Sequence, residues 1–157
     1  MRRRRYLAGL ALAAVPATAG CSSDGGDPAT ETEDNEVYSN ALRDAVESDG
    51  HAVRKLSVGE RATLAYSPAE ASEAGVRASV SDVARAFFDR VYGGWAVAGL
   101  DARVRVDGTL VATWRMERAW IESYLDGDIS RDELGTKVEN SVERRVGTAT
   151  PTAGGDG

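Results

Sequence analysis

Histidine and cysteine are almost missing from this chain of 157 residues, which contains one of each. A single cysteine excludes an internal disulfide and a paired-thiol motif. A single histidine means that a histidine-based metal site or catalytic triad would have to be built around His51. This residue follows Gly50 at a predicted helix-to-strand turn, and we expect it to be a solvent-exposed structural histidine. HExxH and P-loop sequences are also absent, so the sequence predicts no catalytic residue, no metal site and no cofactor.

Lysine and isoleucine are scarce as well. Only two of the 19 basic residues are lysines, and the other 17 are arginines. Together with many acidic residues, this composition resembles that of secreted proteins from halophilic archaea. A genome rich in G and C would also favour arginine, so both explanations stay open. If the halophilic reading holds, molar salt shortens the Debye length to about 3 Å and limits long-range electrostatic steering.

The negative charge is concentrated near the N-terminus. The formal net charge is −6, and residues 22–36 contain six acidic residues and no basic one. The remaining core is nearly balanced and shows no basic face of the kind that binds a phosphate backbone. We therefore expect no nucleic-acid partner, and we expect the acidic residues to serve hydration and solubility.

Residues 1–20 have the layout of a signal peptide. Four arginines at residues 2–5 precede an apolar stretch of 14 residues, 6–19, which is shorter than the roughly 20 residues of a membrane-spanning helix. Arg3 and Arg4 fit a twin-arginine translocation motif. An ordinary Sec-type cluster of positive charge is the alternative.

Thr18-Ala19-Gly20-Cys21 resembles a lipobox, in which cleavage before the cysteine is followed by acylation of its sulfur. The predicted product is a lipoprotein whose partner is the membrane, held through lipid on Cys21 at the extracellular face of the cell. An ordinary signal peptide that contains a cysteine is the alternative. A catalytic thiol is disfavoured, because this segment lacks a fixed environment that would lower the thiol pKa.

The rest of the chain divides by composition. Residues 21–36 are predicted to be the lipidated cysteine and an acidic disordered tether. Residues 37–146 are predicted to form one domain, and residues 147–157 a disordered tail. The domain is long enough to bury roughly two-thirds of its unfolded surface.

Hydrophobic periodicity changes several times within the domain. The pattern predicts a helix over residues 36–49 and strands over residues 52–58 and 61–66, joined by a hairpin turn. Ser67, Pro68 and Glu70 then fit the start of a second helix. Valines at 76, 80, 83 and 91 continue that helix as one ridge.

The second half repeats this pattern. Strands over residues 95–106 and 110–114 flank an Asp-Gly turn, and a bulged turn keeps Trp114 on the apolar face. Two helices follow. The second of them begins with a capping box at Ser130, and Leu134, Val138 and Val142 form its buried edge. The fold class is therefore α+β, a single domain of about four strands in antiparallel hairpins packed with helices, in the order αββ-αββ-αα.

Four aromatic side chains form the main remaining set of candidate site residues. Trp95, Trp114, Trp120 and Tyr124 have a spacing that favours core packing, and a shared aromatic cleft for an apolar or sugar ligand is the alternative. Two functions follow. The favoured one is a non-catalytic binding or interaction module for a surface protein or small molecule. The other is a surface hydrolase that uses a serine or a pair of carboxylates.

The stretch ATWRMERAWIESYLDGDISRDEL, taken with the twin-arginine start and the lipobox, resembles small haloarchaeal lipoproteins that carry a domain of unknown function. The matching residues are Ala112-Thr113-Trp114, Trp120 and Tyr124-Leu125-Asp126-Gly127. The resemblance implies an acidic, membrane-anchored cell-surface protein and no particular activity.

Overall fold

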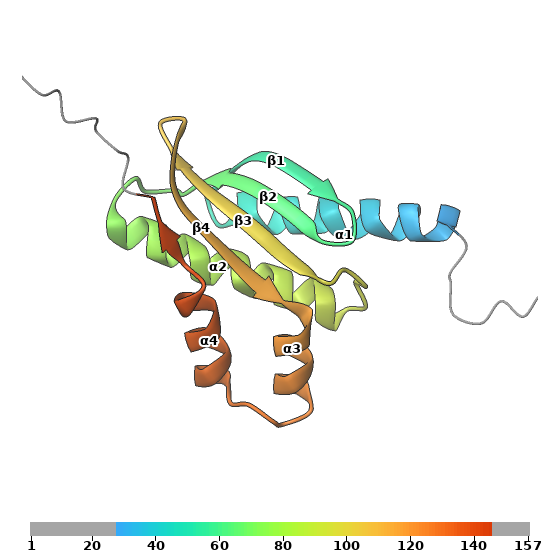
Figure 1. Ribbon diagram of the computed structural model, residues 1–157. Coiled ribbons are helices and arrows are strands. Elements are labelled where there is room, and N and C mark those ends of the chain that lie inside the picture. Colours follow the sequence, from blue (N-terminus) through green and yellow to red (C-terminus); the bar gives the residue numbers. More distant parts are fainter. Residues whose placement is uncertain (1–27, 146–157) are drawn as a thin grey trace, which may run out of the picture.

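The computed structural model describes residues 28–145, with side chains from residue 31 onward. Within this range the chain forms four helices and five strands, a mixed α/β fold (Figure 1). In chain order the elements are α1 (Pro28–Ser48), β1 (Ala52–Val58), β2 (Ala62–Ser67), α2 (Glu73–Tyr92), β3 (Gly99–Val106), β4 (Thr109–Glu117), α3 (Arg118–Leu125), α4 (Arg131–Asn140) and β5 (Glu143–Arg144).

The five strands form one sheet in the order β1-β2-β3-β4-β5. All neighbouring pairs are antiparallel except β2 and β3, which are parallel because α2 crosses over between them. The prediction of an α+β domain with antiparallel hairpins is therefore confirmed in outline. The strand count is five rather than four, and β5 is added after the predicted αββ-αββ-αα order.

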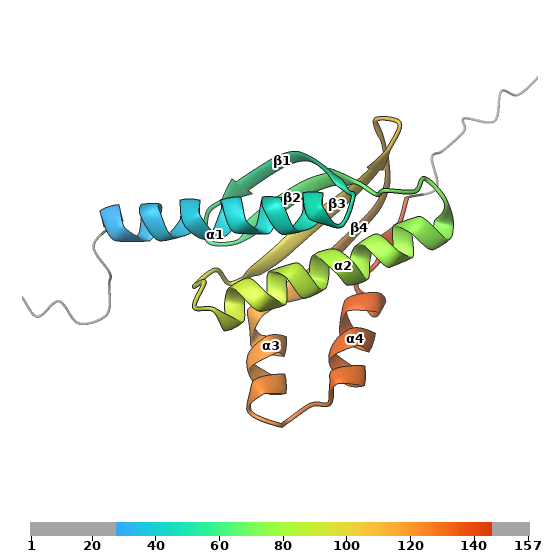
Figure 2. The same cartoon turned by 180° about the vertical axis from the view of Figure 1, so that it is seen from behind.

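Helices α1 and α2 lie on one face of the sheet, as the front view and the view from behind both show (Figures 1 and 2). Ala62, Leu64 and Tyr66 alternate along β2 and are fully buried against these helices. The opposite face carries residues such as Thr63, Asp101 and Arg103, and no described helix covers it. The hydrophobic core therefore lies mainly between the sheet and helices α1 and α2, and Ile121 of α3 and Leu134 and Val138 of α4 extend it.

The register of the β3–β4 hairpin depends on a bulge. Asp107 and Gly108 have φ values of 52° and 80°, as a tight two-residue turn requires. Val104 pairs with Ala112 whereas Arg105 pairs with Leu110, so Val111 is the extra residue. Trp114 thus faces the core, as predicted, but the bulge lies within β4 rather than in the turn.

The start of α1 corrects the predicted tether. The helix begins at Pro28, so residues 28–36 are helical and not disordered. Proline suits the first helical turn, and Glu31 lies where the helix dipole favours a negative charge. Tertiary contacts also hold this segment, because the Trp95 indole Nε1 donates to Asn35 Oδ1 at 2.9 Å. Residues 21–27 lie outside the described part of the chain.

The start of α2 also differs from the prediction. The N-cap is Ser72, whose hydroxyl accepts a hydrogen bond from the Gly75 amide at 3.0 Å. Ser67 instead ends β2, where it pairs with Ala52. Strand pairing therefore outweighs the local capping signal at Ser67. At the other end of the domain, Val142 lies in the link between α4 and β5, and only Leu134 and Val138 are buried on α4.

A hydrogen-bonded cluster sits inside the core. Trp114 Nε1 donates to the Tyr66 hydroxyl at 3.2 Å, and the Ser79 hydroxyl lies 3.2 Å from the same oxygen. Ser79 donates to the Val76 carbonyl at 2.6 Å, so the Tyr66 hydroxyl is left to donate to Ser79. Burial raises the pKa of Tyr66 to about 12, because the phenolate would be desolvated.

This raised pKa predicts a loss of stability at alkaline pH. Unfolded tyrosine releases its proton near pH 10, whereas folded Tyr66 keeps it to about 12. The unfolded state therefore binds fewer protons over this interval, and the free energy of unfolding should fall by about 2 to 3 kcal/mol. Urea titrations from pH 8 to pH 12 measure the fall, and Tyr66→Phe should lack it. Parallel profiles for the two proteins would contradict the assignment.

Candidate functional site

Two adjoining pockets run along α2. The first lies between the N-terminal half of α2 and strands β3, β4 and β5, and has a volume of about 720 Å³. Its floor is mainly valine, so we call it the valine pocket. The second lies between the C-terminal half of α2 and helices α3 and α4, with a volume of about 400 Å³. We call it the aromatic pocket.

The valine pocket has an apolar floor and a charged mouth. Val80 is 5% exposed and Ala112 is 1% exposed, and four further valines beside them are half-buried. These are Val76, Val106, Val111 and Val142. Three arginines and two glutamates line the same pocket, namely Arg77, Arg144, Arg145, Glu73 and Glu139.

An ion pair spans the mouth of the valine pocket. Arg144 Nη1 donates to Glu73 Oε1 at 2.6 Å, which joins β5 to the first turn of α2. Arg77 Nη2 lies 3.9 Å from the same oxygen. The hydrogen bond from Arg144 lowers the pKa of Glu73, since it stabilises the carboxylate. All three side chains are more than half exposed, so this pair contributes little to folding stability.

The aromatic pocket is lined by Phe88 and Tyr124, whose rings meet edge to face at 5.7 Å. Met116, Leu134 and Val138 complete its apolar surface. The Tyr92 ring stacks on Phe88 at 6.3 Å and is 70% exposed. An apolar surface therefore extends from this pocket to the end of α2.

The two pockets meet at Val80, Ser81 and Glu139, which line both. We call the combined feature the α2 groove. Ser81 is exposed at the junction, so a probe placed at this position can contact ligands in either pocket. Periodicity alone identifies the Val76–Val80 ridge only as core. The signal that was missed is the pair Arg144 and Arg145, which follows Val142 and reaches the groove only because β5 pairs with β4.

The four predicted aromatic residues do not form one shared cleft. Trp95 and Trp114 are 1% and 3% exposed and belong to the core. Trp120 is half-buried on α3 and lies under the Lys137 ammonium, 5.8 Å from its ring centroid. Of the four, Tyr124 lines the aromatic pocket and the three tryptophans line neither of these two pockets. Core packing, the favoured prediction, therefore describes Trp95 and Trp114, because strand alternation turns Trp114 inward and Trp95 enters the core from the α2–β3 loop.

His51 is 5% exposed, so the prediction of a solvent-exposed histidine is wrong. Its Nδ1 accepts a hydrogen bond from the Ala69 amide at 2.9 Å, which requires the proton to be on Nε2. Nε2 lies 3.1 Å from Asp82 Oδ2 and donates to it. Both ring nitrogens are therefore engaged, and His51 connects the α1–β1 turn to the β2–α2 loop and to the middle of α2.

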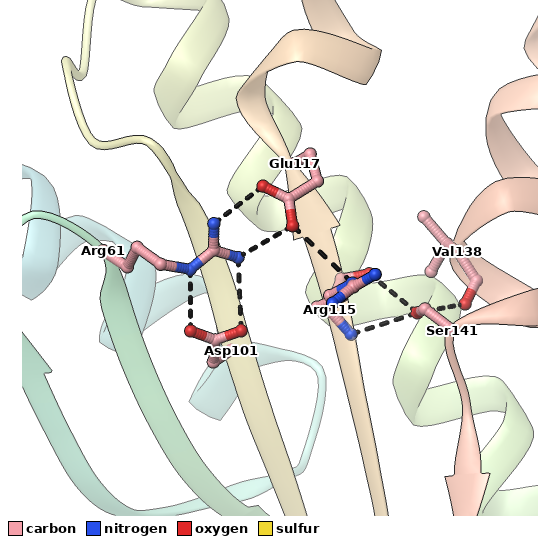
Figure 3. Close-up of polar contacts among 6 residues, drawn as sticks. All are labelled: Arg61, Asp101, Arg115, Glu117, Val138 and Ser141. Atoms are coloured by element: carbon pink, nitrogen blue, oxygen red, sulfur yellow. Dashed lines mark hydrogen bonds and ion pairs between the residues drawn. The ribbon is translucent and has the colours of Figure 1, made fainter.

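A pair of carboxylates does occur on the open face of the sheet, but an arginine lies between them (Figure 3). Arg61 Nε donates to Asp101 Oδ2 and Nη1 donates to Glu117 Oε2, both at 2.7 Å. The two carboxylates raise the pKa of Arg61, which stays charged. Gly99 allows this approach, because a Cβ there would lie 2.8 Å from the Arg61 guanidinium. The network links the β1–β2 turn to β3 and β4.

The predicted export and lipidation residues lie outside the described range, namely Arg3, Arg4, Thr18, Ala19, Gly20 and Cys21. Among residues 28–145, no three His, Cys, Asp or Glu side chains gather closely enough to hold a metal ion. No helix in that stretch combines the length and the apolar character needed to cross a bilayer.

The geometry thus defines an α+β domain in which helices cover one face of the sheet and a groove runs along the crossover helix α2. The chain belongs to the family DUF8159, a domain of unknown function, whose model matches residues 32–148. No curated protein matches the chain, and no solved structure matches it.

Proposed function

We propose that this protein is a non-catalytic binding module of a halophilic archaeon, exported and held at the extracellular face of the membrane by lipid on Cys21. The α2 groove is the binding site. The observation that carries this proposal is the groove itself, a continuous depression with a valine and aromatic floor beneath a charged rim. Volumes of 300–1,000 Å³ with this mixture of side chains are typical of ligand sites.

The arrangement of polar groups favours binding over hydrolysis. His51 has both nitrogens engaged, so it offers no free base to a serine. Asp101 and Glu117 are both bonded to Arg61, which disfavours the separate roles of acid and base that a carboxylate pair needs. A surface hydrolase therefore remains the less supported alternative.

The proposed export and membrane attachment rest on the sequence. The arginines before a short apolar stretch and the lone cysteine after it are typical of an exported lipoprotein. Twin-arginine export carries folded cargo, which suits an acidic protein that folds in high salt. Stable attachment needs two acyl chains, because one gives only marginal binding.

A photoreactive residue placed in the groove tests the binding proposal. We expect benzoylphenylalanine at position 81, in living cells at native salt, to capture a discrete protein or small molecule on illumination. Position 78 supplies the matched control, because Ala78 is also exposed on α2 but lines neither pocket. Mass spectrometry of the purified protein identifies the adducts.

Adducts that form at position 81 and not at position 78 would support a ligand in the groove. Identical adducts at both positions would contradict it, since they would report only the exposure of α2. Absence of any adduct at position 81 would count against the proposal as well.

A further inference from the structure

The mouth of the valine pocket has a local charge opposite to that of the whole chain. Three arginines and two glutamates line it, whereas the chain contains 19 basic and 25 acidic residues. Glu73 is already paired with Arg144 and lies near Arg77. The mouth therefore offers cationic hydrogen-bond donors that suit an anionic group.

The Glu73 carboxylate already occupies the position at Arg144 that an anionic group of a ligand would take. It accepts from Arg144 Nη1 at 2.6 Å, a charge-assisted contact of the kind that carboxylates form best. The Arg144 and Glu73 side chains are 55% and 68% exposed, so water reaches the pair. A second carboxylate arriving at the mouth can replace that of Glu73 on Arg144 at little cost.

Below this ion pair, the pocket offers aliphatic surface. Val76, Val106 and Val142 are half-buried and line the pocket, so they keep apolar area that a ligand can remove from water. The floor contains no aromatic ring on which a planar ligand could stack. An aliphatic body fits this floor better than a sugar or a nucleobase.

We propose that the valine pocket binds an aliphatic carboxylate. The hydrocarbon chain lies on the valine floor, and the carboxylate takes the place of Glu73 on Arg144. This inference rests on the proposed binding function and names the class of ligand for one half of the α2 groove. Glu73 then competes modestly with the ligand carboxylate for Arg144.

Octanoate is the probe for the first test, with octanol and octyltrimethylammonium as chain-matched comparisons. The protein is the full chain carrying Cys21→Ser, so that no detergent competes for the pocket. Isothermal titration in molar KCl should show octanoate binding at least about tenfold more tightly than octanol, because only the carboxylate meets Arg144. The cationic probe should bind most weakly.

Two variants that break the same ion pair should have opposite effects. Arg144→Gln removes the partner of the carboxylate and should weaken octanoate binding by about tenfold or more. Glu73→Gln removes the competitor and should tighten it by about threefold to tenfold. Loss of the Glu73–Arg144 contact occurs in both variants, so a purely structural role cannot produce both results. Arg103→Gln, an exposed arginine on the open sheet face, is the control and should change nothing.

Equal binding of octanol and octanoate would overturn the proposal, and so would weaker binding in both variants. Absence of octanoate binding to the unaltered pocket and to Glu73→Gln would overturn it too. None of these results affects the photocrosslinking experiment at position 81, which tests whether the groove binds any ligand. Failure of the ligand class and failure of the binding function are therefore distinguishable.

Discussion

Trp95→Ala is expected to lower the free energy of unfolding by about 3–5 kcal/mol, the usual cost of removing a large buried aromatic ring. Trp95 is 1% exposed and stacks on Tyr38 at 5.9 Å, and the Phe87 ring meets its edge at 5.8 Å. Its indole nitrogen also donates to Asn35. One side chain thus joins α1, α2 and the loop before β3, and domains of this size are stabilised by only about 5–15 kcal/mol.

Chemical denaturation measures this loss. Hydrogen exchange should also show faster exchange for the amides of residues 31–38 in Trp95→Ala than in the parent. Trp95→Phe retains most of the ring packing but loses the bond to Asn35, so it should cost about 1–2 kcal/mol. Trp120→Ala is the matched control, because Trp120 is only half-buried on α3. Equal stability of the Trp95 and Trp120 alanine variants would contradict the larger contribution that we assign to Trp95.

Cys21→Ser is expected to remove the protein from the membrane fraction. Serine has no sulfur to acylate, so the chain should be found in the medium or as an unprocessed precursor. Cell fractionation locates the protein, and intact mass spectrometry of the parent should show a chain that begins at Cys21 and carries the mass of attached lipid.

Ser22→Ala is the control for this experiment, since it changes the neighbouring residue and leaves the sulfur in place. It should remain with the membrane fraction. Unchanged membrane association of Cys21→Ser would refute the lipid anchor and would favour an ordinary signal peptide that happens to contain a cysteine.

Elements that are marked by residues close together in the sequence were predicted well. The strand over residues 52–58 has the predicted bounds, and the turn at Gly59 and Glu60 marks its end. The capping box at Ser130 is present, with Glu133 donating its amide to the Ser130 hydroxyl at 3.1 Å and accepting the Ser130 amide at 2.7 Å. Both patterns involve only near neighbours in sequence.

Features that depend on distant residues were predicted less well. Ser67 and Ser72 both suit an N-cap, and pairing of Ser67 with Ala52 decides between them. His51 can be buried because the distant residues Ala69, in the β2–α2 loop, and Asp82, in α2, supply partners for its ring nitrogens. The α2 groove likewise requires α4 and β5 to fold back beside α2, which no local pattern in the sequence reveals.

Because α1 begins at Pro28, the N-terminal end of the helix and the valine pocket lie at opposite ends of the molecule. Only six residues, 22–27, separate Cys21 from Pro28, and a chain of that length reaches at most about 24 Å. The 21 residues of α1 span about 31 Å, its first turns project beyond the sheet, and the first turn of α2 lies at the far end of the molecule (Figures 1 and 2). Pro28 thus lies at one end and the valine pocket at the other, so a lipid on Cys21, if present, would be joined to the domain at the end farther from the pocket.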